Sequence, residues 1–397
     1  MFINQILDGL KGIHKPQLNF LRVLFTTLFV CQSRINFSAL ARHSAFEEKT
    51  YRRNFRKKFD FIELNETIIN QSKSCIEAFA MDASFIKKSG KETFGLDKFW
   101  NGCAGRAEKG LEASIISLVD VQANVSFVLT VDQTEPQSAH TATAVEQKTR
   151  TDFYAEQLER HAATLLKHAR IGVFDGFYSK QKFVEKTVEP GFVMISRLRQ
   201  DANLKHLYAG EQKARGRKRK FAEKVDFSDL SKFTEEVFKV PDKQVKLFGA
   251  TVWSVSLKRE IKLVVVQFKK KSVNLFATDV ALGASEIFRL YRSRFSIEFL
   301  IRDAKQSGGL SDCQARDNQA LEFHWNAALT SVNFARGMSQ SNKKETEKKP
   351  FSMKSIKQQF FNEHLLKLFI CKSGLEPSLI KYEETLASLR NYAVIYS

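Results

Sequence analysis

The chain has few cysteines, and none of them is placed to form a structural site. Five occur among 397 residues, scattered and without a CxxC spacing: Cys31, Cys75, Cys103, Cys313 and Cys371. An odd number of separated cysteines argues against a disulfide framework, and without CxxC pairs no zinc site is indicated. This cysteine usage fits a reducing cytosol.

Long hydrophobic runs and several catalytic motifs are also missing. The most apolar stretch, residues 20–31, is about a dozen residues long and contains Arg22. It is too short to span a bilayer, which needs about 20 apolar residues, and it lacks the flanks of a signal peptide. Without a P-loop, G-x-G-x-x-G or G-x-S-x-G, nucleotide-dependent enzymes and serine hydrolases have no support. The histidines show no metal-ligand spacing.

Acidic residues are clearly outnumbered by basic ones. There are 63 Lys and Arg against 44 Asp and Glu, a net charge of +19, and the hydrophobic content of 43% is that of a globular protein. This excess favours a polyanionic partner, and nucleic acid is a better candidate than a membrane surface.

The most informative stretch is residues 286–309. It has no proline, carries apolar residues at helical spacing and closes on two glycines, so it predicts one long helix. Tyr291, Arg294, Glu298 and Lys305 follow one another at offsets of 3, 4 and 7, which places them within an arc of roughly 60°. A narrow charged stripe among apolar residues indicates the wall of a polar cavity, whereas an exposed row of ion pairs is the alternative.

Upstream, the hydrophobic pattern changes to that of an α/β fold. It predicts strands at 75–81, 111–121, 125–131, 171–174 and 192–198, with helices at 146–170 and 179–186. Three strands, a helix, a strand, a helix and a strand is the order of a ribonuclease-H-like core, a mixed sheet flanked by helices.

Asp82 and Asp175 each end a strand-like run, and Glu298 lies within the charged stripe. Acidic residues at strand ends can converge with one from a covering helix, and three carboxylates repel one another unless cations bind. Mg²⁺ prefers such oxygen ligands, and two ions can support both sides of a phosphodiester cleavage. An aspartate at a strand end is more often a turn or cap residue, so the spacing alone does not select this triple.

The pattern Y-x2-R-x3-E-x6-K of residues 291–305 resembles that of DDE transposases of the insertion sequence four family, in the Tyr-Arg-Glu-Lys subgroup. MDASFIKKSG around Asp82 and VFDGFYSK around Asp175 are similar to the first and second aspartate motifs of that family. The resemblance extends over roughly residues 75–310.

The resemblance implies roles for these residues. Asp82, Asp175 and Glu298 would be catalytic and hold two Mg²⁺ ions, with Mn²⁺ as a substitute. The DNA phosphates near the cleaved end would be contacted by Tyr291, Arg294 and Lys305. The protein would cut double-stranded DNA at the ends of an insertion sequence and join the 3′-OH to target DNA, as a homodimer in the bacterial cytosol at the nucleoid. The three tryptophans, Trp100, Trp253 and Trp325, are most simply core residues. If one of them stacks on an extruded base, Trp325 is the candidate.

Two further segments are basic. Residues 35–60 suggest a helix-turn-helix, with Ser38 as N-cap of a short helix and a second helix at 47–59 that would enter a major groove. A solvated basic helix is an equally good interpretation. Residues 213–224 predict a basic loop. The side chains expected to bind DNA in the two segments are Arg52, Arg53, Arg56, Arg217 and Arg219.

The expected organisation has five parts. They are a helical DNA-binding region (1–72), the first part of a ribonuclease-H-like core (73–198), a β-rich insertion (199–280), the second part of the core with the Glu298 helix (281–345) and a C-terminal helical region (346–397). Members of the resembled family carry a β insertion at this place.

Three functions fit this organisation to different degrees. A metal-dependent transposase fits best, because the three acidic residues are all present. A DNA-binding protein without catalysis, either a repressor or a decayed transposase copy, is the alternative. A repair or resolving nuclease would share the metal chemistry, but the β insertion and the Tyr-Arg-Glu-Lys pattern argue against it.

Overall fold

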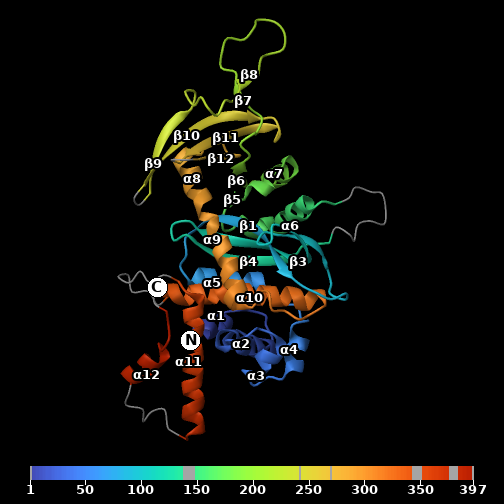
Figure 1. Ribbon diagram of the computed structural model, residues 1–397, viewed down its shortest axis with the longest axis vertical. Coiled ribbons are helices and arrows are strands. Elements are labelled where there is room, and N and C mark those ends of the chain that lie inside the picture. Colours follow the sequence, from blue (N-terminus) through green and yellow to red (C-terminus); the bar gives the residue numbers. More distant parts are fainter. Residues whose placement is uncertain are drawn as a thin grey trace.

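One large mixed sheet, helices on its faces and a helical region at one end make up the molecule (Figure 1). The computed structural model describes residues 2–136, 148–240, 243–268, 271–341, 351–374 and 383–395. The expectation of a mixed α/β protein is confirmed. In these ranges no helix is both long and apolar enough to cross a membrane.

The N-terminal region is helical, as predicted. Its helices are α1 (Phe2–Asp8), α2 (Lys15–Val30), α3 (Phe37–Arg42), α4 (Glu48–Asn54) and α5 (Phe61–Gln71).

Two boundaries in this region differ from the prediction. The N-cap of α3 is Asn36 rather than Ser38, because the Asn36 side chain accepts a hydrogen bond from the Ala39 N–H at 2.9 Å. Helix α4 ends at Asn54 rather than near 59. Phe55 is buried there, with its ring 4.7 Å from that of Phe323, and Asp60 then caps the next helix.

The first six strands form one half of the sheet. They are β1 (Ile76–Lys87), β2 (Asp97–Asn101), β3 (Arg106–Asp120), β4 (Val125–Gln133), β5 (Ile171–Val173) and β6 (Val193–Leu198). β3 pairs antiparallel with both β1 and β4, whereas β1, β5 and β6 run parallel. Strand β1 does not end at Asp82 as predicted, because its pairing with β3 continues to Lys87.

Six more strands extend this sheet instead of forming a separate layer. They are β7 (Leu204–Leu207), β8 (Phe221–Lys224), β9 (Thr234–Val240), β10 (Lys243–Ser254), β11 (Arg259–Gln267) and β12 (Ser272–Ala277). The connection is the pairing of β12 with β6, which starts at Ala277 opposite Ile195. The β-rich segment therefore shares backbone hydrogen bonds with the core sheet.

Helices cover both faces. α6 (Arg150–Leu165) and α7 (Gln181–Val188) cover one face, and α8 (Ala284–Ser293), α9 (Phe295–Asp303) and α10 (Asn318–Ser341) cover the other. The chain continues with α11 (Met353–Lys372) and α12 (Glu383–Arg390). The prediction for 342–350 falls outside the described residues.

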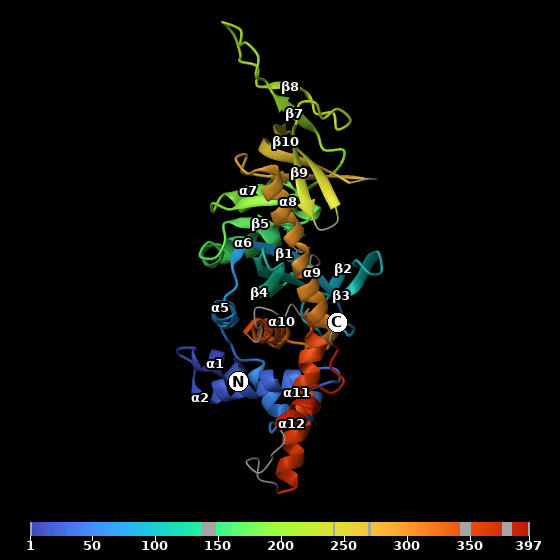
Figure 2. The ribbon, with the colours of Figure 1, turned by 90° about the vertical axis from the view of Figure 1, so that its left-hand side faces the viewer.

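The run predicted as one helix is interrupted at Arg294. α8 and α9 meet there and follow one another along the molecule (Figure 2). α9 then passes into a π-helical turn at Ala304–Gly308. The Ser293 hydroxyl donates to the Leu290 carbonyl at 2.7 Å, and the Ser296 hydroxyl donates to the Ser293 carbonyl at 2.6 Å. Such side-chain bonds compete with the helical ladder, which is interrupted here.

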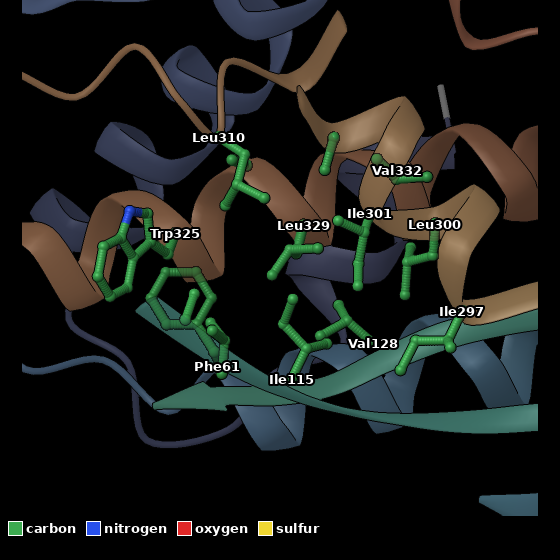
Figure 3. Close-up of a cluster of buried hydrophobic side chains, with 14 of the residues drawn as sticks. Phe61, Ile115, Val128, Ile297, Leu300, Ile301, Leu310, Trp325, Leu329 and Val332 are labelled. Atoms are coloured by element: carbon green, nitrogen blue, oxygen red, sulfur yellow. The ribbon is translucent and has the colours of Figure 1, made fainter. Parts of the chain in front are cut away.

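Alternating side chains of the strands divide the core into two hydrophobic clusters. Ala78 and Ala80 of β1 belong to the cluster under α9 and α10, and Phe79 and Met81 belong to the cluster under α6 and α7. Figure 3 shows α9 and α10 packing on the first of these faces, with Trp325 among the buried side chains.

Two tryptophans differ from expectation. Trp325 is fully buried, so it cannot stack on an extruded base in this conformation, and that suggestion was wrong. Trp100 on β2, interpreted from the sequence as a core residue, is 58% exposed.

Candidate active site

Asp82 of β1 and Asp175, which lies two residues beyond the end of β5, are neighbours at the carboxyl end of β5. Ala80 of β1 is opposite Val173 of β5. Continuing that register by two residues sets Asp82 next to Asp175, in strands about 4.8 Å apart. Because side chains alternate with a period of two, both aspartates point to the face that carries Ala80 and Val173, which α9 covers.

Local hydrogen bonds position the two aspartates where β5 ends. The Asp175 side chain accepts from the Phe177 N–H at 2.8 Å and so caps a 3₁₀ turn at Gly176–Tyr178. Its carbonyl accepts from the Ser196 hydroxyl of β6 at 2.7 Å. Asp82 accepts from the Ala83 N–H at 2.9 Å. Asp175 is thus a turn residue and a member of the acidic pair at once.

Glu298 reaches this face from α9, but its carboxylate is paired with Arg294. The Arg294 guanidinium donates to Glu298 Oε1 at 2.6 Å. The Arg294 side chain is only 8% exposed, while that of Glu298 is 44% exposed. Arg294 Nε is buried without a hydrogen-bond partner among the described residues. The junction of α8 and α9 therefore carries a buried cation beside the acidic cluster.

The charges of these residues act on one another. Burial raises the pKa of Asp82 to about 7, Arg294 opposes that rise, and the charges of Asp175 and Glu298 add to it. Burial also raises the pKa of Tyr291, against the attraction of Arg294 and with a further rise from Asp175. This mutual influence shows that the side chains occupy one site.

Lys305 joins the site from the π turn. Its Nζ donates to the carbonyl of Phe85 on β1 at 2.8 Å. Burial lowers the pKa of Lys305, and the nearby Asp82 counteracts that effect. The structure thus brings together all six residues singled out in the two aspartate motifs and in the charged stripe. The wall of a polar cavity and the i,i+4 ion pair, given as alternatives, are both present.

The three carboxylates are of the type that binds divalent cations, but they are not close enough together to bind one in this structure. Asp82, Asp175 and Glu298 supply the oxygen ligands that Mg²⁺ prefers, and their mutual repulsion would be relieved by a cation. Across the described part of the chain, no three His, Cys, Asp or Glu side chains are close enough together to hold a metal ion as they stand. Glu298 would have to exchange Arg294 for the ion.

A groove of about 720 Å³ opens beside Asp175, Tyr291 and Arg294. It contains four cations that sequence analysis missed, namely Arg197, Arg199, Lys271 and Arg292. Val173 is opposite Ile195 in the parallel pair β5–β6, so Arg197 follows in register beside Asp175. The argument from strand ends that selected Asp175 could have found Arg197 if it had been applied to β6.

The five arginines expected to bind DNA lie elsewhere. Arg52 and Arg56 line a different cleft, between the N-terminal helices and the core, and Arg53 is exposed on α4 without lining it. Arg217 and Arg219 belong to the β7–β8 loop at the far end of the molecule (Figure 1). Arg219 lies over the Tyr208 ring at 4.6 Å. None of the five lines the groove beside the carboxylates.

A sequence model of the family described as DDE superfamily endonuclease matches residues 14–248, which is more than half of the chain. The matched range includes Asp82 and Asp175 and ends before Glu298. No curated protein matches the chain.

Proposed function

This chain belongs to the DDE superfamily endonucleases, and from that premise we propose that it is a transposase of the insertion sequence four family. It would cleave double-stranded DNA at the ends of an insertion sequence and transfer the freed 3′-OH to target DNA. The observation that carries the proposal is the convergence of Asp82, Asp175 and Glu298 on one sheet face, beside Arg294 and Lys305.

The fold supports this assignment through its strand order. In the sheet, β4, β3, β1, β5 and β6 are neighbours in that sequence, with β5 and β6 parallel to β1. This is the arrangement we expect of a ribonuclease-H-like core, with the strands β7 to β12 inserted between β6 and the helix that carries Glu298. We retain the five proposed regions, with the qualification that the insertion is hydrogen-bonded to the core sheet.

Each side chain of the site has a part in this chemistry. Asp82, Asp175 and Glu298 would hold two Mg²⁺ ions, or Mn²⁺ in their place; when bound, these ions supply an activated water and charge stabilisation at the leaving oxygen. Arg294 and Lys305 are cations placed where negative charge develops on a reacting phosphate. Tyr291, packed against Arg294, would position the phosphate backbone near the cleaved end.

The motif supports the finer assignment to the Tyr-Arg-Glu-Lys subgroup. Its four residues lie along α8, the junction at Arg294, α9 and the π turn, and each interacts electrostatically with Asp82 or Asp175. Because two DNA ends must be held together for strand transfer, we propose a homodimer on DNA, acting in the bacterial cytosol.

The test is a cleavage and strand-transfer assay on labelled DNA that carries the ends flanking this gene. It compares Mg²⁺ with EDTA and the parent protein with Asp175→Asn, which keeps an oxygen to accept from the Phe177 N–H. Asp226→Asn is the matched control, because Asp226 accepts from the Ser228 N–H at 2.9 Å in the same type of turn in an exposed loop.

We expect Mg²⁺-dependent nicking and joining by the parent and by Asp226→Asn, and neither by Asp175→Asn. Nicking without joining would indicate a nuclease. Tight binding without cleavage under any metal would support a DNA-binding protein instead.

A further inference from the structure

A cysteine and a histidine that the proposed chemistry does not use lie together near the end of the π turn. Cys313 is 8% exposed, and His324 of α10 is 4% exposed. Cys313 lines a cleft of about 970 Å³ between the N-terminal helices and the core, which gives small molecules a route to the thiol. We infer that Cys313 and His324 form an activated thiol that hydrogen peroxide oxidises. This reactivity goes beyond the proposed function and requires no DNA.

The fold determines which ring nitrogen of His324 is basic. His324 Nε2 lies 2.7 Å from the Gly309 carbonyl oxygen. Because a carbonyl can only accept, Nε2 carries a proton and Nδ1 is left as the basic nitrogen. Beyond this carbonyl, the thiol of Cys313 is the one hydrogen-bond partner of the ring within the described ranges. His324 is therefore a base that a third group holds beside a nucleophile.

The surroundings of Cys313 favour its thiolate form. Burial raises the pKa of Cys313, but the charge of His324 and a hydrogen bond with it lower that pKa, and the net direction is down. The Ala315 N–H and the charge of Lys88 act in the same direction. Lys88 is held there, because its Nζ donates to the Cys313 carbonyl.

The pKa of His324 moves the other way. Burial lowers the pKa of His324, but the charge of Cys313 and the hydrogen bond with it outweigh that effect, and the net direction is up. The Gly309 carbonyl and the charge of Asp312 add to the rise. A lowered thiol and a raised imidazole are the two halves of a thiolate–imidazolium pair.

This pair balances the oxidation step by itself. The Cys313 thiolate attacks one oxygen of hydrogen peroxide, so that an S–O bond forms and the O–O bond breaks. His324 gives its proton to the departing hydroxide, which leaves as water. The sulfur loses two electrons to the peroxide and becomes a sulfenic acid, and the imidazole becomes neutral. Dithiothreitol reverses the step, because its two thiols form a disulfide and the oxygen leaves as water.

Oxidation of Cys313 would disturb the turn that carries Lys305. Gly309 ends this π turn, and its carbonyl is held by His324. Because the thiol is almost fully buried, an added oxygen must displace the residues around it. We therefore expect Lys305 to shift relative to β1, to which it donates a hydrogen bond. The effect on cleavage rests on the proposed function, whereas the reactivity of the thiol does not.

The test treats the full-length protein with hydrogen peroxide at pH 7 and traps sulfenic acid with dimedone. Mass spectrometry of the peptides compares the labelling rate of Cys313 with the rates of the three exposed cysteines, Cys75, Cys103 and Cys371. We expect Cys313 to be labelled at least about 10-fold faster, since an ordinary thiol is only a few per cent ionised at pH 7. Labelling of Cys313 no faster than that of the exposed cysteines would overturn the inference.

The role of the histidine is tested with His324→Gln, whose amide can still donate to the Gly309 carbonyl but cannot act as a base. It should remove most of the advantage of Cys313. The matched control is His168→Gln, because His168 Nε2 lies 2.7 Å from a Glu66 oxygen in a comparable part-buried contact away from the thiol. An unchanged labelling rate in His324→Gln would also refute the pair. Thermal melting checks folding, and Lys88→Met serves if His324→Gln is not folded.

Hydrogen exchange measures the coupling to the π turn. After peroxide treatment we expect faster exchange at residues 304–313, reversal by dithiothreitol, and no change in Cys313→Ser. DNA cleavage by the parent should fall and recover in the same way, while Cys313→Ser stays active. Normal exchange and cleavage by a parent that is oxidised at Cys313 would refute the coupling to Lys305. If the parent never cleaves DNA, the proposed function fails, and dimedone labelling still decides this inference.

Discussion

Arg294 determines the charge of the site at the scale of single residues. Its side chain is buried at the junction of α8 and α9, and its guanidinium compensates carboxylates that would otherwise repel one another. From the sequence, Arg294 and Glu298 could only be placed on one helix face. Their pairing at 2.6 Å and the proximity of Asp82 depend on how α9 lies over the sheet, which spacing along one helix does not contain.

Glu298→Gln separates catalysis from binding. The amide can still accept from Arg294, but it is a poor ligand for a divalent cation. Loss of residues that merely support metal ligands costs about 10- to 100-fold, so we expect cleavage to fall by more than about 100-fold. Duplex affinity should be nearly unchanged, because the cationic surface stays.

The matched control is Glu363→Gln on α11, where Glu363 forms the same type of i,i+4 pair with Lys367 at 2.8 Å. Cleavage rates and anisotropy titrations of both variants measure the effect on catalysis and on DNA binding separately. Normal cutting by Glu298→Gln would remove Glu298 from the catalytic set.

At the scale of elements, the sequence predicts that a helix or strand is present better than it predicts where that element begins and ends. The helical run of residues 286–309 and the strands around Asp82 and Asp175 are found. The interruption of the helix at Arg294 was missed, because it coincides with serine hydroxyls that bond to backbone carbonyls in the folded chain. The continuation of β1 past Asp82 was missed because it depends on β3, which pairs with β1 as far as Lys87. Where a helix or strand ends depends on the segments that it contacts in the folded protein.

The end of the π turn offers a test of close packing. Gly309 has a φ of +79°, and a Cβ added there would lie 2.5 Å from Ile35 Cβ. Gly309→Ala should therefore destabilise the protein by about 2–4 kcal/mol, from left-handed backbone strain and overpacking together.

Gly12→Ala is the matched control, since Gly12 has a φ of +72° and nothing within 4 Å. It should cost only the backbone part, about 1–2 kcal/mol. The free energies of unfolding from urea titrations measure the difference. Equal losses of unfolding free energy in the two variants would mean that the structure around Ile35 accommodates the added methyl group without an energetic penalty.

The junction of α11 with the π turn should respond to pH. Lys357 is 5% exposed and donates from Nζ to the Ser307 carbonyl at 2.8 Å. Burial lowers the pKa of Lys357 from 10.5 to about 8. Between these values the folded protein binds fewer protons than the unfolded chain, so Lys357 makes stability rise with pH over this window.

The Lys357→Met variant should lack this rise of stability with pH. Relative to the variant, the parent should gain roughly 2 kcal/mol of unfolding free energy between pH 8 and 10. The comparison requires urea titrations of both proteins across this range. Parallel stability curves would show that Lys357 is not desolvated in solution.

At the scale of the whole molecule, the N-terminal helices share a core with the rest of the chain. Phe20 and Phe55 pack against Phe323 of α10, and Phe25 packs against Phe334 with ring centroids 4.7 Å apart. The sequence predicted a helical region at 1–72 but not this packing, because contacts between distant segments leave no periodic signal. The same limit hid the pairing of β12 with β6.

Removing residues 1–72 should therefore damage the whole fold. The buried apolar side chains of α10 would be exposed to water, and we expect loss of the cooperative thermal transition and aggregation. Removal of residues 375–397, which lie beyond α11, is the control and should leave the transition cooperative. Calorimetry of the two shortened proteins distinguishes the outcomes. A soluble, cooperatively melting chain without residues 1–72 would show that the helical region is an independent domain.

The pairing of β12 with β6 also limits how the protein can be shortened or recombined. A designer who excised residues 199–280 as a cassette would remove the neighbour of β6 and leave a row of unpaired backbone groups along a strand of mostly buried residues. Such an unprotected edge is a template for intermolecular β-pairing. A trimmed version would need β12 retained, or a charged or proline-bearing strand put in its place.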